Sequence, residues 1–290
     1  MGIFLSHFSA AKYWNIPQIE EVLALDKGEF GLVHYTVSSR AERYVKKGHR
    51  IHVSQLKLPE GGVIKKGDIL VASPELVFLQ LSSQINLHRL VLLGLQLCSF
   101  PPGSPNKSIT TKKKLQKLIN KTPRYPGRQN AQRALKYIED GSASLMESLA
   151  YMILSLPHTL GGYGLGGAVF NYEVQLGEEA ARLLGQKRCF IDILYRQKKI
   201  AVEYDSFTFH NSPKAQGRDA IRSGILYRLG FEIMHLKTIQ LYNLKACDDF
   251  AINLGRRLGR RIRFRAKKYE AMRNQLRSLL PLQDGMVEGT

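Results

Sequence analysis

The chain has 290 residues, 44% of them hydrophobic, and a formal net charge of +19 from 43 Lys and Arg against 24 Asp and Glu. This apolar content excludes a globally disordered chain, and the length suits two domains. No run approaches the ~20 apolar residues that a membrane-spanning helix needs, so no span is expected. The charge favours a polyanionic partner, nucleic acid before an anionic membrane surface, with a solvated basic surface as the alternative.

The first hundred residues predict a small α/β module. A short helix is expected over residues 9–14. Ser73 is a natural N-cap and Pro74 suits the first helical position, so a second helix is expected over 76–81. Strands rich in β-branched and aromatic residues are expected at 32–37, 51–53 and 69–72.

Residues 101–138 form a basic stretch that sets this module apart from the rest. The prolines at its start exclude a regular element there, and ten Lys or Arg with no acid lie between Lys107 and Ile138. We expect a connection with some helix in it. It is either a solvated linker or a segment that contacts phosphates through residues such as Lys112 and Lys113.

Residues 139–250 predict a second α/β layer built on one sheet. A helix is expected over 142–156, then strands, and then a helix over 213–229 that ends at Gly230. The strands are expected at 168–174, 190–195, 200–204 and 231–236. The order of helices and strands is that of a single α/β sheet with helices packed on it.

The last segment, residues 251–290, is expected to be a basic helix and tail. Ten Lys or Arg and one acid lie between Asn253 and Arg277. Arg256 and Arg260 are its candidate phosphate contacts. The cysteines at positions 98, 189 and 247 lie far apart and have no zinc-ligand spacing, which predicts buried thiols in a cytoplasmic protein.

Three carboxylates in otherwise apolar strands are the candidate active site. Side chains alternate along a strand, so Glu203 and Asp205 project from one face. If the two strands form a hairpin, Asp192 joins them at one edge of the sheet. Buried acids need positive charge, and Mg²⁺ or Mn²⁺ with oxygen ligands is a natural source. The alternative is a wet sheet face balanced by Arg and Lys.

Two other signals are discounted. The run from Gly162 to Gly167 contains GxGxxG, but a dinucleotide-binding fingerprint needs a strand before it and a helix after it. Here a helix precedes and strand-like residues follow. His49 and His52 have no matching acids or cysteines, so no metal site is expected there.

The spacing Asp-x(10)-Glu-x-Asp, followed by His210 and by Arg218 and Arg222 on a helix, resembles the very-short-patch-repair-type endonucleases. It is most similar to their uncharacterised bacterial relatives within the PD-(D/E)XK nuclease superfamily. The resemblance covers residues 142–236. It implies a restriction-endonuclease-like fold, with a mixed central sheet flanked by helices, and Mg²⁺-dependent hydrolysis of nucleic acid, with DNA favoured.

The resemblance also assigns roles. It implies that Asp192 and Glu203 hold the metal, with Asp205 as a further ligand where the superfamily usually has lysine. Glu147 matches a helical glutamate that lines such sites, although it also suits a helix cap with Ser144. The relatives commonly carry two histidines, whereas this chain has one.

Three side chains keep two interpretations each. His210 is either a base or phosphate-positioning group, or a loop residue. Arg218 and Arg222, one helical turn apart, either grip a phosphate or pair with the acids in a metal-free site.

Residues 1–100 resemble abortive-infection AbiEi-type antitoxin regions, through the segment from Ser6 to Trp14 and the segment from Ala72 to Leu76. This implies a bacterial protein of phage defence or a toxin–antitoxin system, with a protein partner in that system. It also supports an alternative function, an inactive DNA-binding regulator that uses the nuclease fold only for binding.

Overall fold

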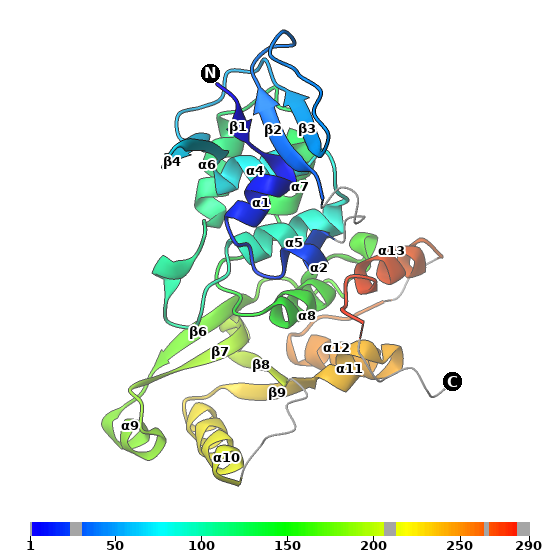
Figure 1. The fold of residues 1–290 in the computed structure, drawn as a ribbon. Coiled ribbons are helices and arrows are strands. Elements are labelled where there is room, and N and C mark those ends of the chain that lie inside the picture. Colours follow the sequence, from blue (N-terminus) through cyan, green and yellow to red (C-terminus); the bar gives the residue numbers. More distant parts are fainter. Residues whose placement is uncertain (1, 24–30, 206–212, 264–266, 283–290) are drawn as a thin grey trace. The chain divides into compact units, whose positions relative to one another are not determined.

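A computed structural model of the chain describes residues 2–23, 31–205, 213–263 and 267–282. The chain divides into two compact units, Met1–Ser99 with Lys107–Asp140, and Phe100–Asn106 with Gly141–Thr290. The described residues form twelve α-helices and two mixed sheets, so the fold class is α/β (Figure 1). None of the helices in these ranges has the length and apolar character to cross a membrane.

The N-terminal unit is built on a five-stranded sheet in the order β3-β2-β1-β5-β4. Its strands are β1 (Phe4–Leu5), β2 (Val33–Val37), β3 (His49–Val53), β4 (Val63–Lys66) and β5 (Ile69–Ala72). Its helices are α1 (His7–Tyr13), α2 (Ile19–Leu23), α4 (Pro74–Leu81), α5 (Leu87–Leu97), α6 (Lys112–Asn120) and α7 (Arg128–Leu135). The expected cap is confirmed, since the Leu76 amide donates to Ser73 Oγ at 3.2 Å.

The basic stretch after residue 100 is folded rather than a separate linker. Helices α6 and α7 lie in it, and Lys107–Asp140 belongs to the N-terminal unit. Leu115 and Ile119 of α6 are fully buried beneath its lysines. Lys112 pairs with Glu139 at 2.9 Å, whereas Lys113 is exposed. Apolar residues at helical spacing therefore lie among the basic residues of this stretch, and they were not predicted to be part of a core.

Histidines from three elements meet in the N-terminal unit, which the sequence did not indicate. The ring of His7 stacks on that of His52 with centroids 3.7 Å apart, and His34 Nδ1 lies 3.0 Å from His52 Nε2. Burial, with the neighbouring imidazoles, lowers the pKa of His7 and brings that of His52 to about 4. These two rings are therefore neutral at neutral pH.

The C-terminal unit is built on a four-stranded sheet in the order β6-β7-β8-β9. Its strands are β6 (Val169–Gln175), β7 (Arg188–Tyr195), β8 (Ile200–Asp205) and β9 (Glu232–Lys237). Its helices are α8 (Leu145–Ser155), α9 (Glu178–Leu184), α10 (Pro213–Arg228), α11 (Thr238–Tyr242), α12 (Leu244–Arg257) and α13 (Lys267–Arg277). The expected hairpin of β7 and β8 is confirmed, and β9 lies parallel to β8.

Helices cover both faces of this sheet. Leu226 of α10 packs in a core cluster with Leu194 of β7. The next residue back, Ile193, points to the other face because side chains alternate along a strand. Ile193 pairs with Phe170, whose ring lies 4.7 Å from that of Tyr151 on α8. Helices α8 and α10 therefore lie on opposite faces, as Figure 1 shows.

The single basic helix expected from Asn253 to Arg277 is wrong. Helix α12 begins earlier, at Leu244, and ends at Arg257, and α13 begins at Lys267. Gly259 has a φ of +71°, in the left-handed region that ends many helices. Basic residues continue across this break, so the basic composition did not indicate that one helix ends and another begins there.

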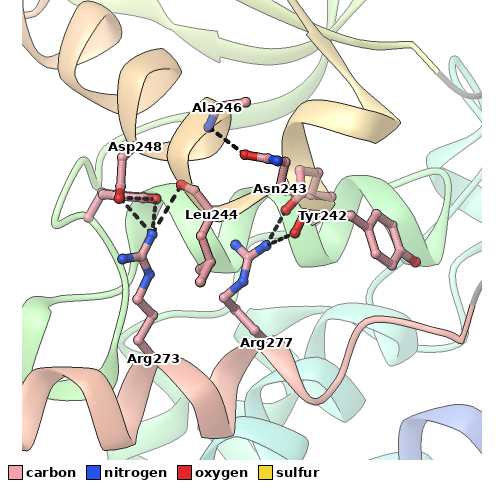
Figure 2. A network of polar contacts seen from close by, with 9 residues as sticks. Tyr242, Asn243, Leu244, Ala246, Asp248, Arg273 and Arg277 are labelled. Carbon is pink, nitrogen blue, oxygen red and sulfur yellow. Dashed lines mark hydrogen bonds and ion pairs between the residues drawn. The ribbon is translucent and has the colours of Figure 1, made fainter. Parts of the chain in front are cut away.

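Arginines of α13 fasten that helix to α11 and α12 (Figure 2). Arg273 Nη2 donates to Asp248 Oδ1 at 2.6 Å, and the Tyr163 hydroxyl donates to the same oxygen at 2.8 Å. Arg277 Nη2 donates to the carbonyls of Leu241 and Tyr242 at 2.6 and 2.7 Å. These carbonyls lie at the end of α11, where a helix leaves acceptors without intrahelical donors.

Replacing Asp248 by alanine should destabilise the protein. It leaves the guanidinium of Arg273, whose side chain is only 14% exposed, without its carboxylate. We expect a loss of about 1–3 kcal/mol of unfolding free energy in urea titrations. The exposed neighbour Asp249, replaced in the same way, should change it by less than about 0.5 kcal/mol. Equal effects of the two variants would contradict a fastening role for Asp248.

Candidate active site

Two of the three predicted carboxylates, Asp192 and Glu203, come together where β7 and β8 separate. The last paired residues are Ile193 and Val202, so Asp192 and Glu203 occupy the next positions on the two strands. The amide of Tyr204 donates to Asp192 Oδ2 at 2.9 Å. Asp192 is thus held by the backbone of the opposite strand, beyond the regular ladder.

Glu203 is the most enclosed of the three, with a side chain 7% exposed. Arg222 of α10 donates from Nη2 to Glu203 Oε1 at 2.9 Å and also to the carbonyl of Phe190. Of the two interpretations for Arg222, the structure shows the ion pair with the acids. The guanidinium ties the helix on one face of the sheet to both strands of the hairpin.

Burial governs the titration of these carboxylates. It raises the pKa of Glu203 to about 7, with help from the nearby charge of Asp192 and against the effect of Arg222. It also raises the pKa of Asp192, although the Tyr204 amide and Arg222 act in the opposite direction. Both carboxyl groups therefore keep their protons to a higher pH than exposed carboxyl groups do.

Glu147, at the start of α8, belongs to the same electrostatic cluster. Its amide donates to Ser144 Oγ at 3.1 Å, which confirms the N-cap, and its carboxylate accepts from the Ala143 amide at 3.0 Å. Burial raises the pKa of Glu147, and the charge of Asp192 is the next cause. Glu147 therefore both caps α8 and lies near the carboxylate of Asp192.

Asn171 of β6 is a site residue that the sequence did not indicate. Its amide nitrogen donates to Glu147 Oε2 at 3.1 Å and to the Gly141 carbonyl at 2.8 Å. Its φ of +41° breaks the regular strand, and asparagine tolerates this region better than most residues. A lone asparagine in a strand pattern carries no signal of such a contact.

Asp205 lies further out, with its side chain 44% exposed. His235 of β9 approaches it, with Nδ1 3.1 Å from Asp205 Oδ2. Lys237 is its partner in the β8–β9 register. Both residues of β9 went unnoticed because their proximity depends on the parallel pairing. His210 lies outside the described residues, so its role stays a prediction.

The predicted phosphate contacts are dispersed. Arg218 is exposed on α10, and Arg256 is exposed on α12. Arg260 donates to the Gly166 carbonyl at 2.7 Å. Lys112 and Lys113 belong to α6 in the N-terminal unit. Of the predicted phosphate contacts, Arg222 alone bonds a carboxylate of the site in the part of the chain that the structure describes.

The carboxylates do not form a ready-made metal cage. Throughout the described ranges, no three His, Cys, Asp or Glu side chains are arranged to hold one ion. Oxygen donors that favour hard cations are nevertheless concentrated here, and Glu203 gives one of its oxygens to Arg222. No model of a known protein family matches the chain, and no curated protein sequence matches it.

The stability of the protein should depend on the charge of Glu203. Because its folded pKa of about 7 exceeds the ordinary 4.5, the folded state keeps a proton that the unfolded chain loses in this window. Wild type should therefore lose stability as the pH rises from about 4.5 to about 8. Relative to it, Glu203→Gln should gain on the order of 3 kcal/mol over that range.

The measurement is urea unfolding of both proteins at several pH values without divalent metal. Glu179→Gln on α9 is the control, because Glu179 is exposed. Its difference from wild type should change by less than about 0.5 kcal/mol over the same range. A constant difference between wild type and Glu203→Gln would show that burial does not raise the pKa of Glu203.

Proposed function

We propose that the C-terminal unit is a metal-dependent nuclease of the PD-(D/E)XK type that hydrolyses phosphodiester bonds, with DNA as the favoured substrate. The observation that carries the proposal is the burial of Asp192 and Glu203 side by side where the β7–β8 hairpin opens. The mixed sheet with helices on both faces supports a restriction-endonuclease-like fold. The resemblance in carboxylate spacing points the same way.

The donor set fits Mg²⁺ or Mn²⁺. Mg²⁺ in proteins is commonly held by one or two carboxylates, with water and substrate phosphate completing its shell. Asp192 and Glu203 are the two carboxylates that would hold it, and Asp205 would contribute from further out. Burial raises the pKa of both carboxylates, and a bound divalent cation would offset the cost of their charged forms.

The residues of the chain have distinct tasks in this proposal. The bond from the Tyr204 amide fixes one oxygen of Asp192 and so orients the other. Arg222 holds Glu203 in place and brings a guanidinium that can bind a phosphate oxygen. Asn171 positions Glu147 beside Asp192. The metal, when bound, makes a coordinated water more acidic and stabilises charge on the phosphate.

Cleavage should depend on Asp192. Labelled duplex and single-stranded DNA are incubated with wild type or Asp192→Asn and with Mg²⁺ or Mn²⁺. We expect the variant to lose activity roughly a hundredfold or more, because several kcal/mol of transition-state stabilisation depend on the metal. The matched control is Asp219→Asn, an exposed aspartate on α10, which should stay within twofold of wild type. Equal cleavage by all three proteins would overturn the assignment.

Metal binding should compete with protons at this site. Both carboxylates must lose their protons to bind Mn²⁺, and their pKa values are raised. In the wild type, Mn²⁺ should therefore raise Tm by about 2–4 °C at pH 8 and by much less at pH 5.5. Asp192→Asn should lose the shift at pH 8. A shift that persists in this variant would place the ion elsewhere.

One observation favours a second candidate function, a DNA-binding regulator without catalysis. Glu203 is already paired with Arg222, and Glu147 is engaged by the helix cap and by Asn171. Such a site is stable without metal, and the +19 charge supports binding to the DNA backbone. Binding to its own promoter with no cleavage and no Mn²⁺ shift would favour the regulator. Both candidates suit a role in phage defence or a toxin–antitoxin system.

A further inference from the structure

A hollow of about 410 Å³ lies at the turn of the β7–β8 hairpin, where the lining residue Tyr195 ends β7 three residues after Asp192. Four consecutive residues from Tyr195 to Lys198 line it from the turn. The rest of the lining comes from the loop before β6 and from the segment around the end of α12, through Gly167, Leu258 and Arg260. Segments distant in sequence therefore build this hollow together.

The charged side chains that line the hollow are all positive. Arg196, Lys198 and Arg260 are all cations, and no acid lines the hollow. In the ranges that the structure describes, none of the three has a carboxylate within ion-pair distance, although other arginines of this unit do. Three cations that gather without a counter-charge repel one another, and a bound anion would relieve that repulsion.

Two of the cations are held in place. Arg260 Nη1 donates to the Gly166 carbonyl at 2.7 Å, and the Arg196 guanidinium lies 5.3 Å from the centroid of the Tyr172 ring. Cation–π contact and a backbone bond both restrict these long side chains. A ligand would then find donors that are partly ordered in advance, which lowers the entropy cost of binding.

The glycine run gains a different role from the dinucleotide fingerprint that its letters suggest. Strand β6 follows the run, so no helix N-terminus is available to hold a phosphate. Gly167 has a φ of +95°, which side chains other than glycine rarely adopt, and it lines the hollow. The positive charge that a helix N-terminus would offer a phosphate comes here from Arg196, Lys198 and Arg260.

We propose that this hollow binds the phosphate groups of a nucleic-acid strand or of a nucleotide. Guanidinium and ammonium groups are the side chains that bind phosphate oxygens best, and the volume lies within the range of ligand pockets, ~300–1,000 Å³. Buried Tyr195 and Leu258 add apolar atoms to the lining. The site is separate from the carboxylates and does not depend on the proposed catalysis.

Metal-free binding of a fluorescein-labelled 20-base-pair DNA duplex tests the proposal by anisotropy in EDTA between 50 and 200 mM KCl. The variant combines Arg196→Gln and Lys198→Gln, leaving Arg260 and its bond to Gly166 intact. We expect about tenfold weaker binding at 100 mM and a salt dependence reduced by about two in logarithmic slope. Catalysis plays no part in this measurement, so a failed cleavage assay leaves it unaffected.

The matched control combines Arg182→Gln and Lys187→Gln, which removes the same charge from exposed positions of the same unit. It should bind DNA within twofold of wild type. Urea unfolding of both double variants should match wild type, so that lost binding is not lost folding. Equal weakening in the two double variants would show that only the overall charge matters.

A second arm separates a free nucleotide from a nucleic-acid strand. ADP and inorganic pyrophosphate are added to wild type and both double variants, and Tm is recorded, with adenosine as the phosphate-free control. A Tm rise with ADP that the Arg196/Lys198 variant loses assigns the hollow to nucleotides. Weaker DNA binding in that variant, without a rise with ADP, assigns it to a strand. If that variant matches the control variant in both arms, the proposal is overturned.

Discussion

The burial of two carboxylates between apolar strands is the constraint on which the C-terminal unit depends. Asp192 and Glu203 sit among residues such as Ile191 and Val202 that are completely buried. Each acid must find donors there, because an unpaired buried charge is costly. The opening of the β7–β8 ladder supplies the Tyr204 amide to Asp192, and the position of Arg222 supplies a guanidinium to Glu203. The break at Asn171 supplies a donor to the neighbouring Glu147.

The local part of this arrangement could be predicted from the sequence. A turn of polar residues between two apolar runs indicates a hairpin, and alternation then places Glu203 and Asp205 on one face. The cap at Ser144 also follows from the local sequence, in which Glu147 comes three residues after Ser144. These features depend on residues a few positions apart, which is why the pattern of one short segment is enough.

The remaining contacts depend on tertiary structure. The sequence left a phosphate and the acids open as partners of Arg222, and only the packing of α10 decides between them. His235 reaches Asp205 only because β9 pairs in parallel with β8. Charge was a misleading guide in two places. It hid the buried Leu115 of α6, and it hid the break at Gly259 between α12 and α13. Basic residues tolerate both a helix surface and a loop, so their frequency does not mark boundaries.

Arg222 connects the candidate site to the helix α10 that packs on the sheet. The same guanidinium nitrogen bonds the side chain of Glu203 and the carbonyl of Phe190, so one arginine joins α10 to both strands of the hairpin. A cation that takes Glu203 from Arg222 must weaken this attachment. By linkage, anything that presses α10 more firmly onto the sheet must weaken the cation's hold to the same extent. The affinity of the carboxylates for a cation and the stability of the packing of α10 on the sheet are thus thermodynamically coupled.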